Sequence, residues 1–327
     1  MMALLSRVAT VLYVLGRDVE RTEHLARLVR VHFELSLDRS AQSRRRFWSD
    51  FLVLAGWPAS DPVVRDHAIA MVLGDTAGPS LRRSLESARR AAQAVRPSLS
   101  IETWEQLSAL YWRLSDAGWQ GAPDAYLRQV EMGTQLIAGL VDDTMPHDEA
   151  WHFVKLGKHH ERAASVVRVV ARKAAELGEH DEDAIAWASV LRSCASLEAY
   201  RIQFGAAVSA QTVSRFLLLD RVSPHSAGFC VAAALATVQA IDGPGVESPP
   251  HRVLGRLAAT FQYADPVEVG ASPGDLAARF EEQNAELNQA LRQAYFQPSQ
   301  LAVDPDEGDR LTRHTQQQQQ GRRRRAI

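Results

Sequence analysis

Two short stretches of this sequence place arginine, lysine and glutamate side chains at the same spacing. The pattern is Leu-Gly-Arg/Lys-x-x-Glu-Arg, which starts at Leu15 and again at Leu156, 141 residues later. Its candidate functional residues are Arg17, Glu20, Arg21, Lys158, Glu161 and Arg162. Guanidinium groups bind carboxylates and phosphates through two parallel N–H donors. The pattern therefore indicates either Glu–Arg ion pairs or a pocket that holds a small anion such as a phosphate or a carboxylate.

The spacing predicts that each set lies on one face of a helix, because residues three and four positions apart are neighbours on a helix surface. Gly16 and Gly157 occupy the same place in the two copies. A glycine costs about 1 kcal/mol in a helix interior relative to alanine, so glycines at equivalent places favour a close approach of two backbones. We therefore predict that the two motif helices pack together about a pseudo-twofold axis.

In that packing Glu20 meets Arg162, and Glu161 meets Arg21. Buried Glu–Arg pairs often determine the register of packing and take no part in chemistry, so a structural role is one interpretation. The other is a polar pocket at the symmetry axis, in which the arginines hold an anion. The sequence leaves both interpretations open.

The elements that position these residues are predicted to be helices. Apolar residues recur at intervals of three and four along most of the chain, and no segment shows sustained alternation rich in Val, Ile and Thr. The first helix is expected over Leu5–Leu35. Further helices are expected over about 43–55, 62–74, 80–96, 100–114, 124–141, 148–177, 182–204, 210–219, 225–241, 250–263 and 274–295. Asp61, Asp148 and Asp181 are the expected N-caps of three of them.

We predict an all-α multi-helix bundle with an internal duplication of the Glu-Arg motif helix. Residues 1–296 form one helical domain with two pseudo-repeats, of about 1–141 and 142–296. From Gln297 the helical pattern gives way to acidic, glutamine and arginine runs, so residues 297–327 are expected to be a disordered tail. Its four arginines, Arg322–Arg325, are a short cluster with no basic surface implied elsewhere, and no nucleic-acid binding is predicted.

Composition limits the class of protein. The 327 residues carry 37 Lys and Arg against 39 Asp and Glu, and 46% are apolar, which excludes a disordered chain. Cys194 and Cys230 are too few for a disulfide framework, which favours the cytoplasm. The longest uncharged stretch, Val222–Ile241, contains too many polar residues to span a bilayer, so no membrane association is expected.

Other candidate sites are weaker. Glu20 and His24 lie one helical turn apart and could share a metal, but such neighbours are common, and no metal site is predicted. Each cysteine lies in an apolar helix, where a buried, unreactive thiol is expected. No glycine-rich phosphate loop followed by lysine occurs, and no cofactor is predicted.

The sequence resembles the bacterial Alpha-E family, all-helical proteins named for a Glu-Arg motif, over roughly Leu4–Leu291. The resemblance rests on the order and spacing of many short matches. They are Leu5–Ala9, Leu12-Tyr13, Leu15–Arg17, Glu20-Arg21, Ser84-Leu85, Ala88-Arg89, Ser100, Glu102, Trp104, Pro146, Asp148-Glu149, Trp151, Phe153, Leu156-Gly157, Glu161–Ala163, Leu197–Arg201, Phe216–Asp220, Pro224 and Ser226.

This resemblance implies an all-helical protein without an assigned activity of its own. It also implies a place beside circularly permuted ATP-grasp ligases and transglutaminase-like cysteine peptidases, in systems that make or modify peptides through amide bonds. We therefore expect a non-catalytic accessory or substrate-presenting partner of such proteins. The alternative is an enzyme or small-anion-binding protein that uses a polar Glu/Arg pocket at the interface of the two motif helices.

The chain also departs from the family pattern. Thr10 and Val11 stand where Glu-Asn is expected, and Lys158 replaces an arginine of the second motif. Residues 90–93 differ from the expected Glu-Asn-Ala-Arg. These departures favour a divergent paralogue with a binding or scaffold role.

Overall fold

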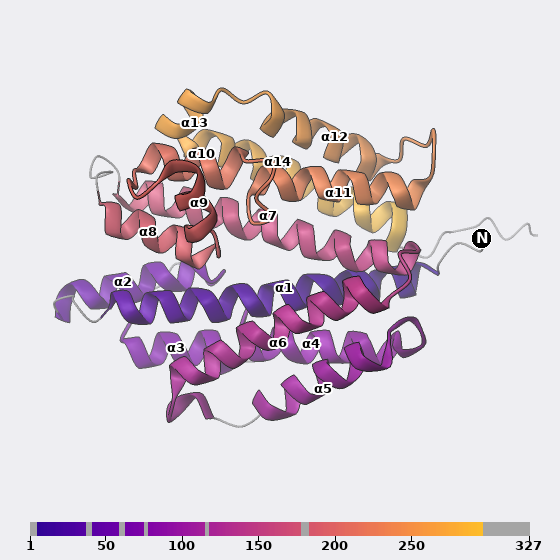
Figure 1. The fold of residues 1–327 in the computed structure, drawn as a ribbon, viewed down its shortest axis with the longest axis horizontal. Coiled ribbons are helices and arrows are strands. Elements are labelled where there is room, and N and C mark those ends of the chain that lie inside the picture. The colour runs from indigo at the N-terminus through magenta and orange to yellow at the C-terminus, as the bar shows by residue number, and fades with distance from the viewer. Residues whose placement is uncertain are drawn as a thin grey trace, which may run out of the picture.

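The computed structural model describes residues 5–36, 41–58, 63–74, 78–114, 118–177 and 183–296. These residues form fourteen α-helices and no strand, which confirms the predicted all-α class (Figure 1). The helices are α1 (Ser6–Leu35), α2 (Ala41–Leu54), α3 (Arg65–Gly74), α4 (Leu81–Ala94), α5 (Ile101–Leu114), α6 (Pro123–Thr144), α7 (Glu149–Leu177), α8 (Ala184–Ser193), α9 (Leu197–Phe204), α10 (Ala210–Leu219), α11 (Ala227–Asp242), α12 (Pro249–Gln262), α13 (Pro266–Ala271) and α14 (Pro273–Leu291). The predicted tail, residues 297–327, lies outside the described residues.

The two motif helices, α1 and α7, form the centre of the bundle. They lie side by side and run in the same direction, with α4, α5 and α6 on the side of α1 and α10 to α14 on the side of α7 (Figure 1). Both central helices are buried along most of their length. Their polar side chains therefore need partners inside the protein, because an unpaired charge in the interior is costly.

The closest backbone approach is at the two motif glycines. A Cβ atom on Gly16 would lie 1.9 Å from the carbonyl oxygen of Val154, and one on Gly157 would lie 2.0 Å from that of Tyr13. Neither place has room for a side chain, which is the close approach that the sequence predicted. The two contacts are reciprocal, because each glycine faces the residue three positions before the other glycine. A duplication of the two halves of the chain stays a prediction.

Serine and aspartate caps explain several helix starts. The hydroxyls of Ser80 and Ser226 accept hydrogen bonds from backbone N–H groups in the first turns of α4 and α11. Asp148 accepts from the backbone N–H groups of Ala150 and Trp151, as expected of the predicted cap of α7. Arg162 of α7 donates to the carbonyl oxygen of Pro224, two residues before the Ser226 cap, so the start of α11 lies close to the second motif.

The prediction of one helix over 182–204 is wrong. The structure ends α8 at Ser193 and begins α9 at Leu197, with Ala195 at a φ of 52° between them. The N–H of Ser196 bonds to the carbonyl oxygen of Leu191 at 2.8 Å, the closing bond of a helix that ends in a left-handed residue. Alanine rarely adopts this left-handed conformation. The sequence has no glycine or proline between the two helices, so nothing in it marked the break.

Other helix boundaries also differ from the predictions. The helix expected to begin at Pro62 begins at Arg65, while Asp61 and Pro62 lie outside the described residues. Asp181 also lies outside them, and the cap of α8 is Asp183. The six-residue helix α13 was not predicted, because it is shorter than the window in which helical periodicity can be recognised.

The glycine contact leads to a prediction about stability. Gly16→Ala should lower the free energy of unfolding by about 2–3 kcal/mol, because the new methyl group forces the α1 and α7 backbones apart. Gly139→Ala is the matched control, since this exposed glycine of α6 has no atom within 4 Å of the new Cβ. It should stabilise the protein by about 0.5–1 kcal/mol. Urea unfolding of both variants measures the difference, and equal stabilities would contradict the close contact.

Candidate functional site

The glutamate of each motif binds the second arginine of the other motif. Arg162 donates from Nε to Glu20 Oε1 at 2.6 Å and from Nη2 to Oε2 at 2.7 Å. Arg21 donates from Nε and Nη2 to the two carboxylate oxygens of Glu161, both at 2.8 Å. The predicted reciprocal pairing is therefore confirmed, and both pairs are bidentate.

The two pairs differ in their access to solvent. The side chains of Glu20 and Arg162 are only 7% and 9% exposed, and Arg162 Nη1 also donates to the carbonyl oxygen of Pro224 at 3.1 Å. In the other pair Glu161 is equally buried, but Arg21 is 33% exposed. One pair is thus enclosed by protein, while the arginine of the other reaches the surface.

The electrostatic surroundings favour the charged forms of Glu161 and Arg162. Burial acts to raise the pKa of Glu161, but the charge and hydrogen bonds of Arg21, with help from Arg168, outweigh it and hold that pKa below its usual range. Burial acts to lower the pKa of Arg162, and Glu20 more than compensates. A general acid at neutral pH needs a carboxyl group with a raised pKa, which Glu161 does not have.

The hollows in the described part of the chain divide the predicted residues between them. Glu20 and Lys158 line a narrow crevice of about 30 Å³ between α1, α6 and α7, with mostly apolar walls. Arg17 and Arg21 line a separate, open hollow of about 400 Å³ beside α4. The ion pairs therefore occupy the α1–α7 interface. The crevice lies on the α6 side of this interface, and the hollow lies on the α4 side.

Among the six predicted residues, the side chain of Lys158 has no hydrogen bond or ion pair with the described part of the chain. Burial lowers its pKa below the usual lysine value, and the positive charges of Arg162 and Lys155 add to that effect. Glu20 acts in the opposite direction, but it is already held by Arg162. The apolar walls of the crevice are the main reason that the ammonium group is destabilised there.

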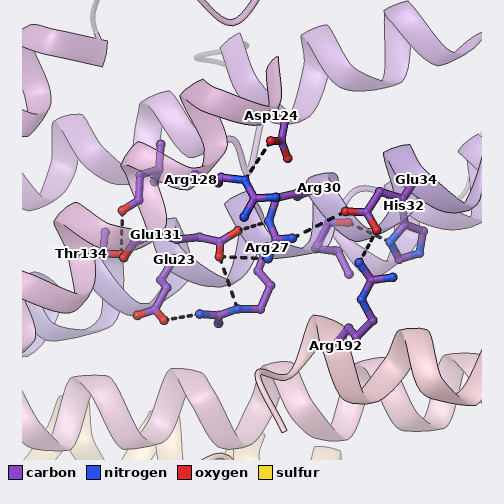
Figure 2. Close-up of polar contacts among 12 residues, drawn as sticks. Glu23, Arg27, Arg30, His32, Glu34, Asp124, Arg128, Glu131, Thr134 and Arg192 are labelled. Atoms are coloured by element: carbon purple, nitrogen blue, oxygen red, sulfur yellow. Dashed lines mark hydrogen bonds and ion pairs between the residues drawn. The ribbon is translucent and has the colours of Figure 1, made fainter. Parts of the chain in front are cut away.

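A second polar network joins α1 to α6 and α8, and the sequence did not predict it (Figure 2). Arg30 donates to both oxygens of Glu131 on α6, at 2.7 and 3.1 Å, and Arg27 donates to Glu23 at 2.6 Å. Arg192 of α8 binds Glu34. The spacing of Glu23 to Arg27 and of Arg30 to Glu34 is a helical i,i+4 signal that was present in the sequence. Glu131 is far away in sequence and carries no such signal.

Three histidines lie on or beside the motif helices. Burial lowers the pKa of His24 to about 3 and that of His225 to about 2, with nearby arginine charges contributing. His24 Nε2 has no hydrogen-bond partner in the described part of the chain. His160 lies between Tyr13 and Asn284, with its ring nitrogens 2.6 and 2.5 Å from their oxygens. With their pKa values lowered, these imidazole rings are neutral at physiological pH.

Neither cysteine has the environment of a nucleophile. Both thiols are buried, and burial raises the pKa of Cys194 and of Cys230 to about 12, so they are protonated and unreactive as expected. Within the described ranges, no three His, Cys, Asp or Glu side chains are grouped so that they could hold a metal ion. None of the helices that the structure describes combines the length and apolar character needed to cross a bilayer.

An all-helical bundle with paired Glu-Arg motifs on its two central helices defines the class of this protein. The model of the Alpha-E family, described as a predicted alpha-helical domain with a conserved ER motif, matches residues 4–296. The chain therefore belongs to the Alpha-E family.

The relatives are themselves uncharacterised. The chain is 24% identical over 222 residues to uncharacterized protein Rv2567 of Mycobacterium tuberculosis (strain ATCC 25618 / H37Rv), a match that covers 65% of the chain and 25% of the relative. Uncharacterized protein Mb2597 of Mycobacterium bovis matches with the same identity and coverage. The matched segment thus spans about a quarter of the length of these relatives. The comparison with solved structures found no match.

The enclosed ion pair leads to a prediction about stability. Glu20→Ala should lower the free energy of unfolding by about 3–5 kcal/mol, because it leaves Arg162 buried without a counter-charge. Glu286→Ala is the control, since it breaks the Arg256–Glu286 pair, whose side chains are about half exposed. Its effect should stay within about 1 kcal/mol. A thermal midpoint of Glu20→Ala equal to that of the wild type would contradict the structural role.

The buried histidines lead to a prediction about pH. Between pH 6.5 and about 3 an unfolded His24 binds a proton that the folded protein does not, so stability falls as the pH is lowered through this range. His24→Leu should reduce the slope of unfolding free energy against pH by up to about 1.4 kcal/mol per pH unit below pH ~6.

The control for this measurement is His67→Leu, which removes an exposed histidine of α3. Measurements are best kept above about pH 5, since below it Glu161, whose folded pKa lies under its usual 4.5, also begins to remove stability. Equal slopes for His24→Leu and the wild type would show that the histidine is not held neutral by burial.

Proposed function

We propose that this protein is a non-catalytic accessory or substrate-presenting partner in a cytoplasmic ATP-grasp-type amide or peptide ligation system with a transglutaminase-like component. The observation that carries the proposal is the reciprocal pairing of the motif. Glu20, Arg21, Glu161 and Arg162 bind one another within the α1–α7 interface. The motif that is typical of the family therefore acts as a structural element, which favours a protein that works by binding.

The lengths of the relatives support the same proposal. In the mycobacterial relatives the matched segment makes up 25% of a longer chain. A helical domain that is covalently joined to further protein in its relatives is suited to act beside another protein. The ligase and peptidase partners themselves are those that the Alpha-E resemblance implies.

A surface for such a partner lies where two turns meet. Val222, Tyr263 and Val267 are 84%, 80% and 75% exposed, among the most exposed large apolar side chains of the described residues. Arg221 Nη2 donates to the carbonyl oxygen of Gln262 at 3.0 Å, which holds the turn after α10 against the end of α12. Exposed apolar side chains that lie together mark protein interfaces, and we propose that these three form such a surface for the ATP-grasp-type protein.

The test is affinity capture from the native cell lysate with mass spectrometry. The wild-type chain should retain an ATP-grasp-type ligase or a transglutaminase-like protein through a moderate salt wash. The triple variant Val222→Ser, Tyr263→Ser, Val267→Ser should retain roughly tenfold less of it, because a few buried apolar contacts dominate most interfaces.

The matched control replaces two exposed apolar residues of α6, Met132→Ser and Leu136→Ser, and should retain the partner like the wild type. Surface changes of this kind have little effect on folding. Capture of neither protein class by the wild type would contradict the accessory function. Equal losses in the triple variant and in the control would contradict the choice of surface.

A further inference from the structure

The hollow beside α1 gathers four guanidinium groups. Arg17 and Arg21 of α1 line it on one side, and Arg83 and Arg90 of α4 line it on the other. Its volume is about 400 Å³, within the range of small-molecule sites. The remaining lining residues are Asp18, Gly78, Pro79, Ser84 and Ser87. The described lining thus contains four positive side chains and a single carboxylate.

We propose that this hollow is a binding site for a phosphate-class anion, such as a phosphorylated small molecule. An anion with several oxygens accepts hydrogen bonds from several guanidinium groups at once. Guanidinium forks match the oxygens of a phosphate better than a single ammonium does. The site is independent of the accessory function, since it uses a different surface from Val222 and Tyr263.

The α1 half of the site is held in place before any ligand arrives. Arg17 Nε donates to Asp18 at 2.9 Å, and the Asp18 side chain is only 3% exposed. Arg21 is held by two bonds to the buried carboxylate of Glu161. Both arginines are therefore oriented by buried acids, and less side-chain entropy is lost when an anion binds.

The α4 half presents its charges on one helix face. Arg83 and Arg90 are seven residues apart, which places them two turns apart on the same side of α4. Ser87 lies between them on that face, and its hydroxyl is a further hydrogen-bond donor. The first turn of α4 begins beside Gly78 and Pro79 of the lining, so the positive end of this helix also favours an anion.

In the second motif, the arginine that corresponds to Arg21 is enclosed by protein. Arg162, which occupies the position of Arg21 in the second motif, is 9% exposed and donates to Pro224 O. His225, which is half-buried, lies close enough for the charge of Arg162 to lower its pKa. Arg21 instead faces an open hollow. The site is also distinct from a pocket between the two motif helices, because α4 supplies half of its guanidinium groups.

The experiment is calorimetric titration of the full chain with inorganic pyrophosphate at low ionic strength. The wild type should bind one equivalent, and binding should weaken as salt is added. The double variant Arg83→Ala, Arg90→Ala should bind at least about tenfold more weakly, because two charge-assisted contacts are lost. Both arginines are exposed, so circular dichroism should show an unchanged fold.

The matched control is Arg82→Ala with Arg128→Ala, two exposed arginines outside the hollow whose removal changes the net charge equally. It should bind pyrophosphate within about twofold of the wild type. Citrate, a multivalent anion without phosphorus, should bind more weakly than pyrophosphate. The proposal fails if the wild type shows no binding at about 10 mM. It fails equally if the control loses as much affinity as the test variant, or if citrate binds as tightly as pyrophosphate.

Discussion

The contact between the backbones of α1 and α7 is the constraint on which the rest of the structure depends. At Gly16 and Gly157 the two helices approach so closely that neither place admits a Cβ atom. One turn further along, that spacing brings Glu20 against Arg162 and Glu161 against Arg21. Charges buried this deeply are tolerated only when they are paired and hydrogen-bonded, so the backbone contact and the ion pairs require each other.

The same contact determines to which side of the α1–α7 interface the other polar side chains of the motifs point. Because the pairs fill the α1–α7 interface, the remaining polar side chains of the motifs are directed to its two sides. Lys158 enters an apolar crevice beside α6, while Arg17 and Arg21 face α4. Arg21 therefore has two tasks, since it neutralises Glu161 inside the protein and presents positive charge outside. This double use shows how a structural motif can also create a binding surface.

The proposed accessory function and the proposed anion site are compatible because they use different parts of the molecule. The exposed apolar turns follow α10 and α12, two helices on the side of α7 (Figure 1). The arginine hollow lies between α1 and α4. With the α1–α7 centre between them, the two proposed surfaces leave a partner and a phosphate-class ligand free to bind at once. The buried, neutral histidines of that centre also limit the pH range over which it is stable.

Most of the helices, the close approach of the two motifs and the partners within each ion pair could be predicted from the sequence. These follow from the helical period and from one repeated pattern, which are local properties of the chain. Tertiary structure alone decided which side chains from other helices join them. Glu131, Arg83 and Arg90 lie far from the motifs in sequence, and the packing of α6 and α4 on α1 brings them near. The break at Ala195 was equally hidden from the sequence, because alanine normally favours a helix and rarely adopts the left-handed conformation that it has here.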